Sequence, residues 1–328
     1  MAKVADKIPA VKIEQWELFN KFNKDTTEEF LLESTQLSNK TLEGYKSALG
    51  IFFYWVYENL NNISLLEIKG RDFLKFQNWL TRRGMSPSGV RFKRAAISSL
   101  NGYIILYYED LYPTFKNFIT KKISAPPPAF VHEKQPMDKD EWELVIKTLT
   151  ERKEWQKLAY LHFTYSSGCR REESRQLWKE DVNSVLITKV KDGKDVLYYQ
   201  THDTRCKGSG KAGKVRKLQF STEAMDAMKK WLEVRGEDDC PFMFVAKYAG
   251  KINQVSENVF NNWMGEVEEL IGRRVHPHQI REKRATDMVV VEGKNIKSAQ
   301  KLLGHNSSET TQIYVIRNTD DDIDDAFS

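Results

Sequence analysis

The chain has 328 residues, of which 40% are hydrophobic and 30% are charged. Its length allows two domains of ordinary size, and its composition excludes a disordered chain. No apolar run approaches the length that crosses a bilayer, and residues 1–9 lack the apolar core of a signal peptide. We therefore expect a soluble, cytoplasmic protein without a membrane partner.

Charge is unevenly distributed along the chain. The net charge is only +5, from 51 Lys and Arg against 46 Asp and Glu. Residues 205–217 hold six basic side chains and no acid, whereas residues 320–325 are acidic at all but one position. Such runs indicate either binding surfaces or solvated loops. The three cysteines, Cys169, Cys206 and Cys240, have neither the even number of a disulfide framework nor the spacing of a zinc site.

Residues 26–123 have the pattern of a helical domain. Apolar residues recur at three- and four-residue steps over residues 42–56, and Ser38 and Thr41 offer N-cap oxygens just before them. This pattern predicts one long amphipathic helix.

Two further helices are expected over residues 73–80 and 90–107. The second of these begins with Arg91, Lys93 and Arg94. Cations at a helix start oppose the helix dipole. They are therefore either tolerated there or contact something outside the helix, such as phosphate.

A proline run marks the clearest boundary in the chain. Residues 125–129 read Ala-Pro-Pro-Pro-Ala, which favours extended geometry and cannot continue a helix. The expected organisation is a short N-terminal extension, a helical domain, a linker and a second domain with an acidic tail, over residues 1–25, 26–124, 125–137 and 138–328.

The second domain mixes helices with short strands. Asp138 is expected to cap a helix, and a longer helix leads to Gly168. Residues 185–220 alternate apolar and polar side chains, which predicts a small antiparallel sheet with turns at Gly193 and at the glycines between 208 and 213. The pattern after residue 221 is helical to the end. The expected fold class is mainly α with a small antiparallel β-sheet.

Four short patches and one tyrosine stand out. Each patch alone has an ordinary structural explanation, but their joint occurrence in one order is improbable. They are GCRREESRQL at 168–177, Lys207 in a glycine-rich basic turn, HPHQIR at 276–281, LGH at 303–305, and Tyr314 nine residues after His305.

These patches resemble the motifs of the tyrosine recombinase (phage-type integrase) family, and the resemblance covers nearly the whole chain. It implies a helical core-binding domain over residues 26–124 and an α+β catalytic domain after it. The chain departs from the usual family pattern at Cys169, Arg171 and residues 282–284, which leaves the catalytic residue types intact. The implied catalytic residues are Arg170, Lys207, His278, Arg281, His305 and Tyr314, with Glu173 in support.

The chemistry of these side chains fits the cleavage of a phosphodiester. Negative charge builds on the non-bridging oxygens, and Arg170 and Arg281 supply planar donors that match them. Tyr314 can form a covalent phosphotyrosine once cationic neighbours favour its phenolate. A metal or nucleotide cofactor is not required in this scheme.

The remaining residues are expected to move protons or to orient the cluster. Lys207 protonates the departing 5′ oxygen, and His278 exchanges a proton with Tyr314. His305 donates a hydrogen bond to the phosphate, and Glu173 orients a member of the cluster from one helical face.

Several alternatives remain open at this point. Lys211 or Lys214 could take the role of Lys207. His276 and His278 form a potential metal pair, but no third ligand lies at ligand spacing nearby. The chain could instead be a type IB topoisomerase, a DNA-binding factor with an inactive site, or a metal-dependent nuclease.

The resemblance also implies partners. We expect double-stranded DNA, bound through phosphate contacts that weaken steeply with salt. The candidate DNA contacts are Arg91, Lys93, Arg94, Arg205, Lys211, Lys214 and Arg216.

The resemblance further implies that four protomers assemble on two DNA sites and exchange strands in pairs through a Holliday junction. The acidic segment 320–328 is a candidate for docking on a neighbouring protomer, and an accessory protein is a further candidate partner. With its short N-terminal extension, the domain layout resembles that of the simpler Xer or Cre type of recombinase. We expect the protein to be associated with the nucleoid.

Overall fold

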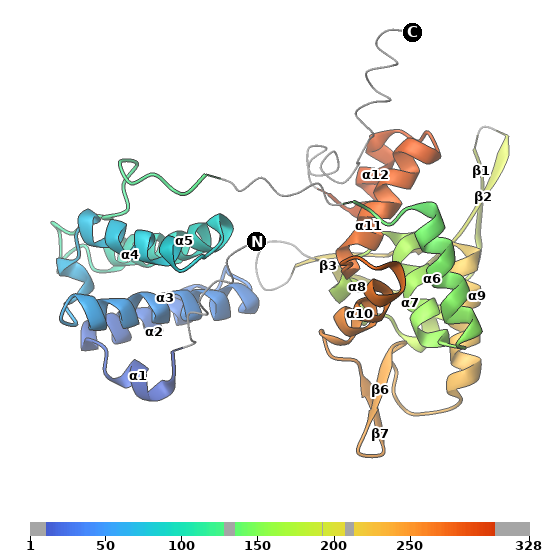
Figure 1. Cartoon of the computed structure of the whole chain (residues 1–328), viewed down its shortest axis with the longest axis horizontal. Helices are drawn as coiled ribbons and strands as arrows, with labels where there is room; N and C mark the ends of the chain where they lie inside the picture. Colours follow the sequence, from blue (N-terminus) through green and yellow to red (C-terminus); the bar gives the residue numbers. More distant parts are fainter. Residues whose placement is uncertain (1–10, 128–134, 192, 207–212, 306–328) are drawn as a thin grey trace, which may run out of the picture. The chain divides into compact units, whose positions relative to one another are not determined.

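The computed structural model describes residues 11–127, 135–191, 193–206 and 213–305. These residues form two compact units with separate hydrophobic cores (Figure 1). Unit one comprises residues 11–127, and unit two comprises the described residues from 135 to 305. Helices capable of spanning a bilayer are absent from the described ranges.

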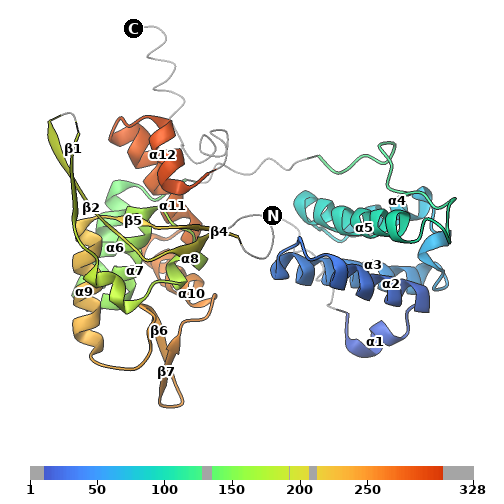
Figure 2. The ribbon, with the colours of Figure 1, turned by 180° about the vertical axis from the view of Figure 1, so that it is seen from behind.

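Unit one is an all-helical bundle. The long predicted helix is confirmed, and the Ser38 hydroxyl caps it by accepting from the Thr41 backbone N–H at 3.2 Å. Figures 1 and 2 both show α2 and α3 in one layer and α4 and α5 in the other. The elements are α1 (Ile13–Glu17), α2 (Lys21–Glu33), α3 (Asn39–Asn59), η1 (Leu65–Glu67), α4 (Gly70–Arg82) and α5 (Pro87–Tyr107).

This helical unit begins earlier than the expected boundary at residue 26. The Asn20 side chain caps α2 by accepting from the Phe22 backbone N–H at 3.0 Å. Phe19 is buried in the core, and Trp16 and Phe22 pack against that core. The first helices are short and anchored by aromatic side chains, so they lack the long periodic pattern that identified the later ones.

Unit two is built around α7, whose Tyr160 and Phe163 are fully buried. The Asp138 carboxylate caps α6 as expected, accepting from the Glu141 backbone N–H at 2.8 Å. The helices are α6 (Lys139–Glu151), α7 (Trp155–Ser167), α8 (Arg171–Arg175), η2 (Lys179–Asn183), α9 (Thr222–Arg235), α10 (Val259–Ile271), α11 (Pro277–Thr286), η3 (Asp287–Val291) and α12 (Ile296–Leu303).

The strands between residues 187 and 220 form two antiparallel sheets where one was expected (Figure 2). One sheet orders β1 (Ile187–Lys191), β2 (Lys194–Gln200) and β5 (Gln219–Phe220), and the other pairs β3 (Thr204–Cys206) with β4 (Lys214–Arg216). The buried Asp181 carboxylate accepts from the His202 backbone N–H at 2.8 Å, where the chain turns from the first sheet to the second. The expected strand over residues 215–220 is split, because its first part pairs with β3 and its last part pairs with β2.

The expectation of continuous helix after residue 221 is wrong in one place. Strands β6 (Val245–Tyr248) and β7 (Lys251–Gln254) form a hairpin there. Its turn residues, Ala249 and Gly250, both have positive φ, at 49° and 77°. This is the backbone geometry of a two-residue hairpin turn. The strand side chains are mostly polar or exposed, so the apolar alternation that signals a strand is missing.

Candidate active site

Arg281 joins segments that are far apart in the sequence. It lies on α11, its side chain is 0% exposed, and one N–H of its guanidinium donates to the Gly168 carbonyl. A second donates to the Leu303 carbonyl at 2.8 Å. Gly168 has φ 58° and ends α7, while Leu303 ends α12. One buried cation therefore holds the ends of two helices together.

His305 lies beside this arginine and is 8% exposed. Its Nε2 is 2.7 Å from Arg281 Nη2. A guanidinium can only donate, so Nε2 accepts and the proton of the neutral imidazole is on Nδ1. Burial and the positive charges of Arg281, Arg170, His278 and Arg216 lower the pKa of His305 to about 4. His305 is therefore neutral at pH 7.

This lowered pKa predicts an acid-dependent loss of stability. An unfolded histidine has a pKa of about 6.5, so the unfolded chain takes up a proton before folded His305 does. Well above a pH of about 6.5 the imidazole is neutral in both the folded and the unfolded chain, so no stability is lost. As the pH falls from there towards about 4, the unfolded chain binds the proton and the folded chain does not, so the free energy of unfolding decreases. We expect a loss on the order of 2–3 kcal/mol. Urea unfolding between pH 7.5 and 4.5 should give a shallower pH dependence for His305→Gln than for the native chain, and parallel curves would contradict the assignment.

Arg170 and Glu173 form the second half of the cluster, at the start of α8. Glu173 is 2% exposed, and its carboxylate accepts from the Arg170 backbone N–H and from Arg170 Nη1, both at 3.0 Å. Burial raises the pKa of Glu173, but that backbone hydrogen bond and the charges of Arg216 and Arg170 outweigh burial and lower it. Glu173 is therefore a carboxylate. It orients Arg170, whose side chain remains 27% exposed.

His278 stands in the first turn of α11, three residues before Arg281 and on the same helical face. It is half-buried, and its charge is among those that lower the pKa of His305. The structure thus brings together Arg170, Glu173, His278, Arg281 and His305. Lys207, Lys211 and Tyr314 lie outside the described residues.

The candidate DNA contacts are placed differently from one another. Arg205 and Lys214 are exposed on β3 and β4. Arg216 was expected to be a DNA contact in an exposed basic strip. Its side chain is instead only 21% exposed, and its guanidinium lies 3.3 Å from the Glu173 carboxylate. Its inward direction is the main feature of the cluster that sequence reasoning missed.

The three basic residues of α5 belong to unit one. Arg94 donates to the Gln77 side chain and, at 2.8 Å, to the Ile123 carbonyl, so it holds the segment that follows the bundle. Arg91 donates to the Pro126 carbonyl at 2.9 Å. Burial lowers the pKa of Lys93. At least the two arginines thus have contacts within their own unit.

A metal site was a further possibility for His276 and His278. Across residues 11–127, 135–191, 193–206 and 213–305, His, Cys, Asp and Glu side chains nowhere gather in a group of three that could bind a metal ion. Cys169 and Cys206 are buried free thiols.

Comparison with known proteins assigns the chain to a family. Residues 135–320 match the phage integrase family. The SPbeta prophage-derived recombinase-like protein YomM of Bacillus subtilis is 32% identical over 313 residues, which cover 94% of this chain and 91% of YomM. The chain belongs to the phage integrase family. The chain is also similar to tyrosine recombinase XerA of Pyrococcus horikoshii. The two are 28% identical over 297 residues, which cover 89% of each chain.

Solved structures share the fold of this phage integrase family member. The crystal structure of a lambda integrase tetramer bound to a Holliday junction matches with a TM-score of 0.60 and 16% identity, covering 94% of this chain and 78% of that chain. The fold similarity confirms the predicted mainly α class with small antiparallel sheets. The family match confirms the predicted enzyme class, a tyrosine recombinase.

Proposed function

We propose that this chain cuts and rejoins DNA through a covalent 3′-phosphotyrosine formed by Tyr314. The observation that carries the proposal is the buried position of Arg281, between the Gly168 carbonyl, the Leu303 carbonyl and His305 Nε2. This arrangement gathers three of the sequence patches around one guanidinium. Family membership supports the same reaction.

Arg170 and Arg281 provide the charge that the reaction needs. Attack on the phosphodiester gives a pentacoordinate phosphorane with additional negative charge on its non-bridging oxygens, and fixed guanidinium donors stabilise that charge without reorganisation. Both arginines are held by partners within the protein before DNA binds. His305 would add a hydrogen bond from Nδ1, since its Nε2 accepts from Arg281.

Proton transfer would involve two further residues. Lys207 is proposed to give a proton to the 5′ oxygen as the bond to phosphorus breaks, and His278 to exchange a proton with the Tyr314 hydroxyl. The covalent bond keeps the energy of the phosphodiester, so attack by another 5′ hydroxyl rejoins the strand and frees Tyr314. In both the cleavage and the rejoining step, every proton that one group loses is taken up by a named side chain or by the DNA.

The assembly is proposed by analogy with a neighbour in fold. Lambda integrase forms a tetramer bound to a Holliday junction. We infer that four copies of this chain assemble on two duplex sites and exchange strands in pairs through such a junction. In this scheme the helical domain at residues 26–124 contacts DNA phosphates, and the protein acts on nucleoid DNA.

The first experiment tests covalent cleavage directly. A site is selected from a random duplex library by binding to Tyr314→Phe protein, and is then synthesised as a nicked duplex that traps the covalent intermediate. Incubation with the native chain in excess chelator should yield a protein–DNA adduct that survives denaturation. Tyr314→Phe should bind the same duplex with unchanged affinity and give no adduct.

Other outcomes would identify the alternatives. Strand cleavage that stops in chelator would indicate a metal nuclease, and specific binding without any adduct would indicate an inactive DNA-binding factor. An adduct that relaxes supercoiled DNA but never joins two different duplexes would indicate a topoisomerase.

A further inference from the structure

Arg216, on β4, contacts three separate segments of unit two. Its Nε donates to Cys206 Sγ at 3.2 Å, its Nη1 to the Leu302 carbonyl at 2.6 Å, and its Nη2 to Glu173 Oε2 at 3.3 Å. These partners lie on β3, α12 and α8. One guanidinium thus links the strand that precedes Lys207 to the helices that precede His305 and follow Arg170.

The contact with the end of α12 is a close one. Gly304 ends that helix with φ 67°, and a Cβ atom at this position would lie 2.9 Å from Arg216 Nη1 and 3.0 Å from Arg216 Cζ. An alanine here would be strained by the left-handed backbone and would displace the guanidinium from the backbone that leads directly into His305. The turn carrying His305 and the Arg216 side chain therefore fix each other.

Arg216 also shares the Glu173 carboxylate with Arg170. The carboxylate is 2% exposed, and each of its oxygens accepts from an arginine side chain. Arg170, Arg216, Arg281 and Glu173 together carry a net charge of +2. Without Arg216 this sum falls to +1, and the buried carboxylate has Arg170 as its remaining guanidinium partner. Glu173 would then offset the charge that Arg170 presents to a phosphate.

We propose that Arg216 is a positioning residue for DNA cleavage: it balances the charge of Glu173 and holds the end of α12, so that Arg170 and His305 act fully on the scissile phosphate. The inference rests on the proposed function. Arg216 acts through its neighbours, because its guanidinium donates to protein acceptors on three sides.

The test compares two substrates that differ in charge at one phosphorus. One is the selected nicked duplex, and the other carries a methylphosphonate at the scissile position, which lacks one anionic oxygen and so needs less cationic stabilisation. Arg216→Gln, Glu173→Gln and the double variant are compared by the rate of adduct formation and by melting temperature. We expect Arg216→Gln to slow cleavage of the phosphodiester about 10²-fold, the effect of misplacing a reacting group.

On the methylphosphonate substrate, Arg216→Gln should slow adduct formation by only roughly tenfold or less, because less negative charge needs stabilisation there. The double variant should be faster than Arg216→Gln, because it removes the carboxylate that Arg216 balances. Arg235→Gln serves as the matched control, since Arg235 is another largely buried arginine bonded to backbone carbonyls. Its Nη2 contacts Asp238 at 2.5 Å and the Cys240 carbonyl at 2.9 Å.

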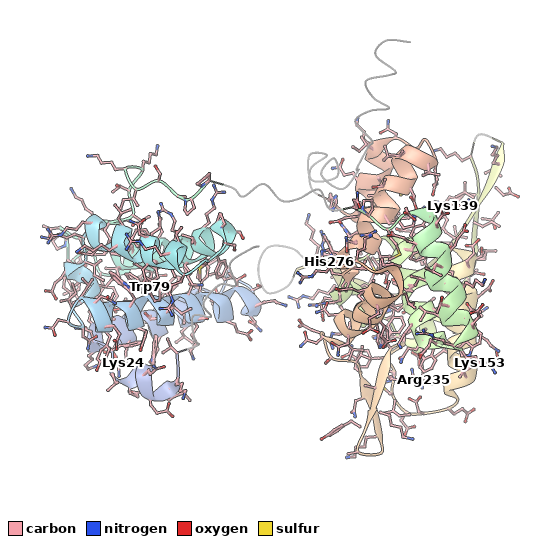
Figure 3. The ribbon with its side chains drawn as sticks, in the orientation of Figure 1. Lys24, Trp79, Lys139, Lys153, Arg235 and His276 are labelled. Carbon is pink, nitrogen blue, oxygen red and sulfur yellow. The ribbon has the colours of Figure 1, made fainter. Side chains whose placement is uncertain are left out.

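Figure 3 labels Arg235 at the lower end of α9, and labels His276, which immediately precedes α11, higher in the same unit. The control should lower the melting temperature and leave the cleavage rate of the folded protein unchanged. Equal losses on both substrates, or a rate of Arg216→Gln that equals the native rate, would overturn the proposal for Arg216 alone. A native chain that forms no adduct on either substrate would overturn the proposed function as well.

Discussion

Replacing Arg281 by methionine is expected to slow DNA cleavage by orders of magnitude and to destabilise unit two. The guanidinium is 0% exposed and donates to two buried carbonyl groups, at Gly168 and Leu303. Each unsatisfied buried acceptor costs about 1–3 kcal/mol, so the free energy of unfolding should fall by roughly 2–6 kcal/mol. Loss of one fixed donor to the phosphorane should slow cleavage by at least about 10²–10³-fold. Urea unfolding and adduct formation measure the two effects separately.

A conservative variant separates charge from geometry. Arg281→Lys keeps the positive charge but has a single ammonium in place of the planar fork that reaches both carbonyls and His305 Nε2. It should therefore remain far below the native cleavage rate. A lysine variant with native activity and stability would show that the fork is not needed, and would contradict this description of the site.

Gly168→Ala is expected to have the second largest effect. Gly168 has φ 58°, and a Cβ atom there would lie 2.5 Å from Leu303 Cδ2. The left-handed backbone costs an alanine about 1–2 kcal/mol, and the steric overlap adds about 1–3 kcal/mol. The unfolding free energy should thus fall by roughly 2–5 kcal/mol. Because the Gly168 carbonyl accepts from Arg281, cleavage should also slow by up to about 10²-fold.

Gly272 provides the matched control for this variant. It ends α10 with φ 73°, and a Cβ atom there would meet nothing within 4 Å. Gly272→Ala should cost only the backbone term of about 1–2 kcal/mol and leave cleavage unchanged. Combining Gly168→Ala with Leu303→Ala should destabilise the protein less than the sum of the single changes, since the overlap is removed. Strict additivity would contradict the assigned clash.

Much of the helical structure follows from local chemistry. The caps at Ser38 and Asp138 and the helix that leads to Gly168 are read from residue type and spacing alone. The split of the strands was not readable, because it depends on which distant residues pair, such as Tyr199 with Phe220 and Thr204 with Arg216. Pairing between distant residues has no local signature.

The site shows the same division. Arg170, His278, Arg281 and His305 stand in motifs whose residue types match the chemistry, so sequence reasoning could name residues that the structure gathers into one cluster. Arg216 stood in a run of basic residues, in which residue type does not separate inward from outward side chains.

A usable signal was present for Arg216 in the pairing of β4 with β3. Arg216 pairs with buried Thr204, whereas the neighbouring Val215 pairs with exposed Arg205. Paired residues share one face of a ladder and the next residue faces the other way. Arg216 therefore points to the side of Thr204, but that conclusion needs the register first.

The most direct test is to locate the covalent bond. After the adduct is digested with nuclease and trypsin, the native chain should yield one nucleotide-bearing peptide spanning residues 302–317, which contains a single tyrosine, Tyr314. Fragmentation should place the phosphate on that tyrosine, and Tyr314→Phe should give no modified peptide. A phosphate on another residue, or cleavage without any modified peptide, would contradict the claim that Tyr314 attacks a phosphate held by Arg170 and Arg281.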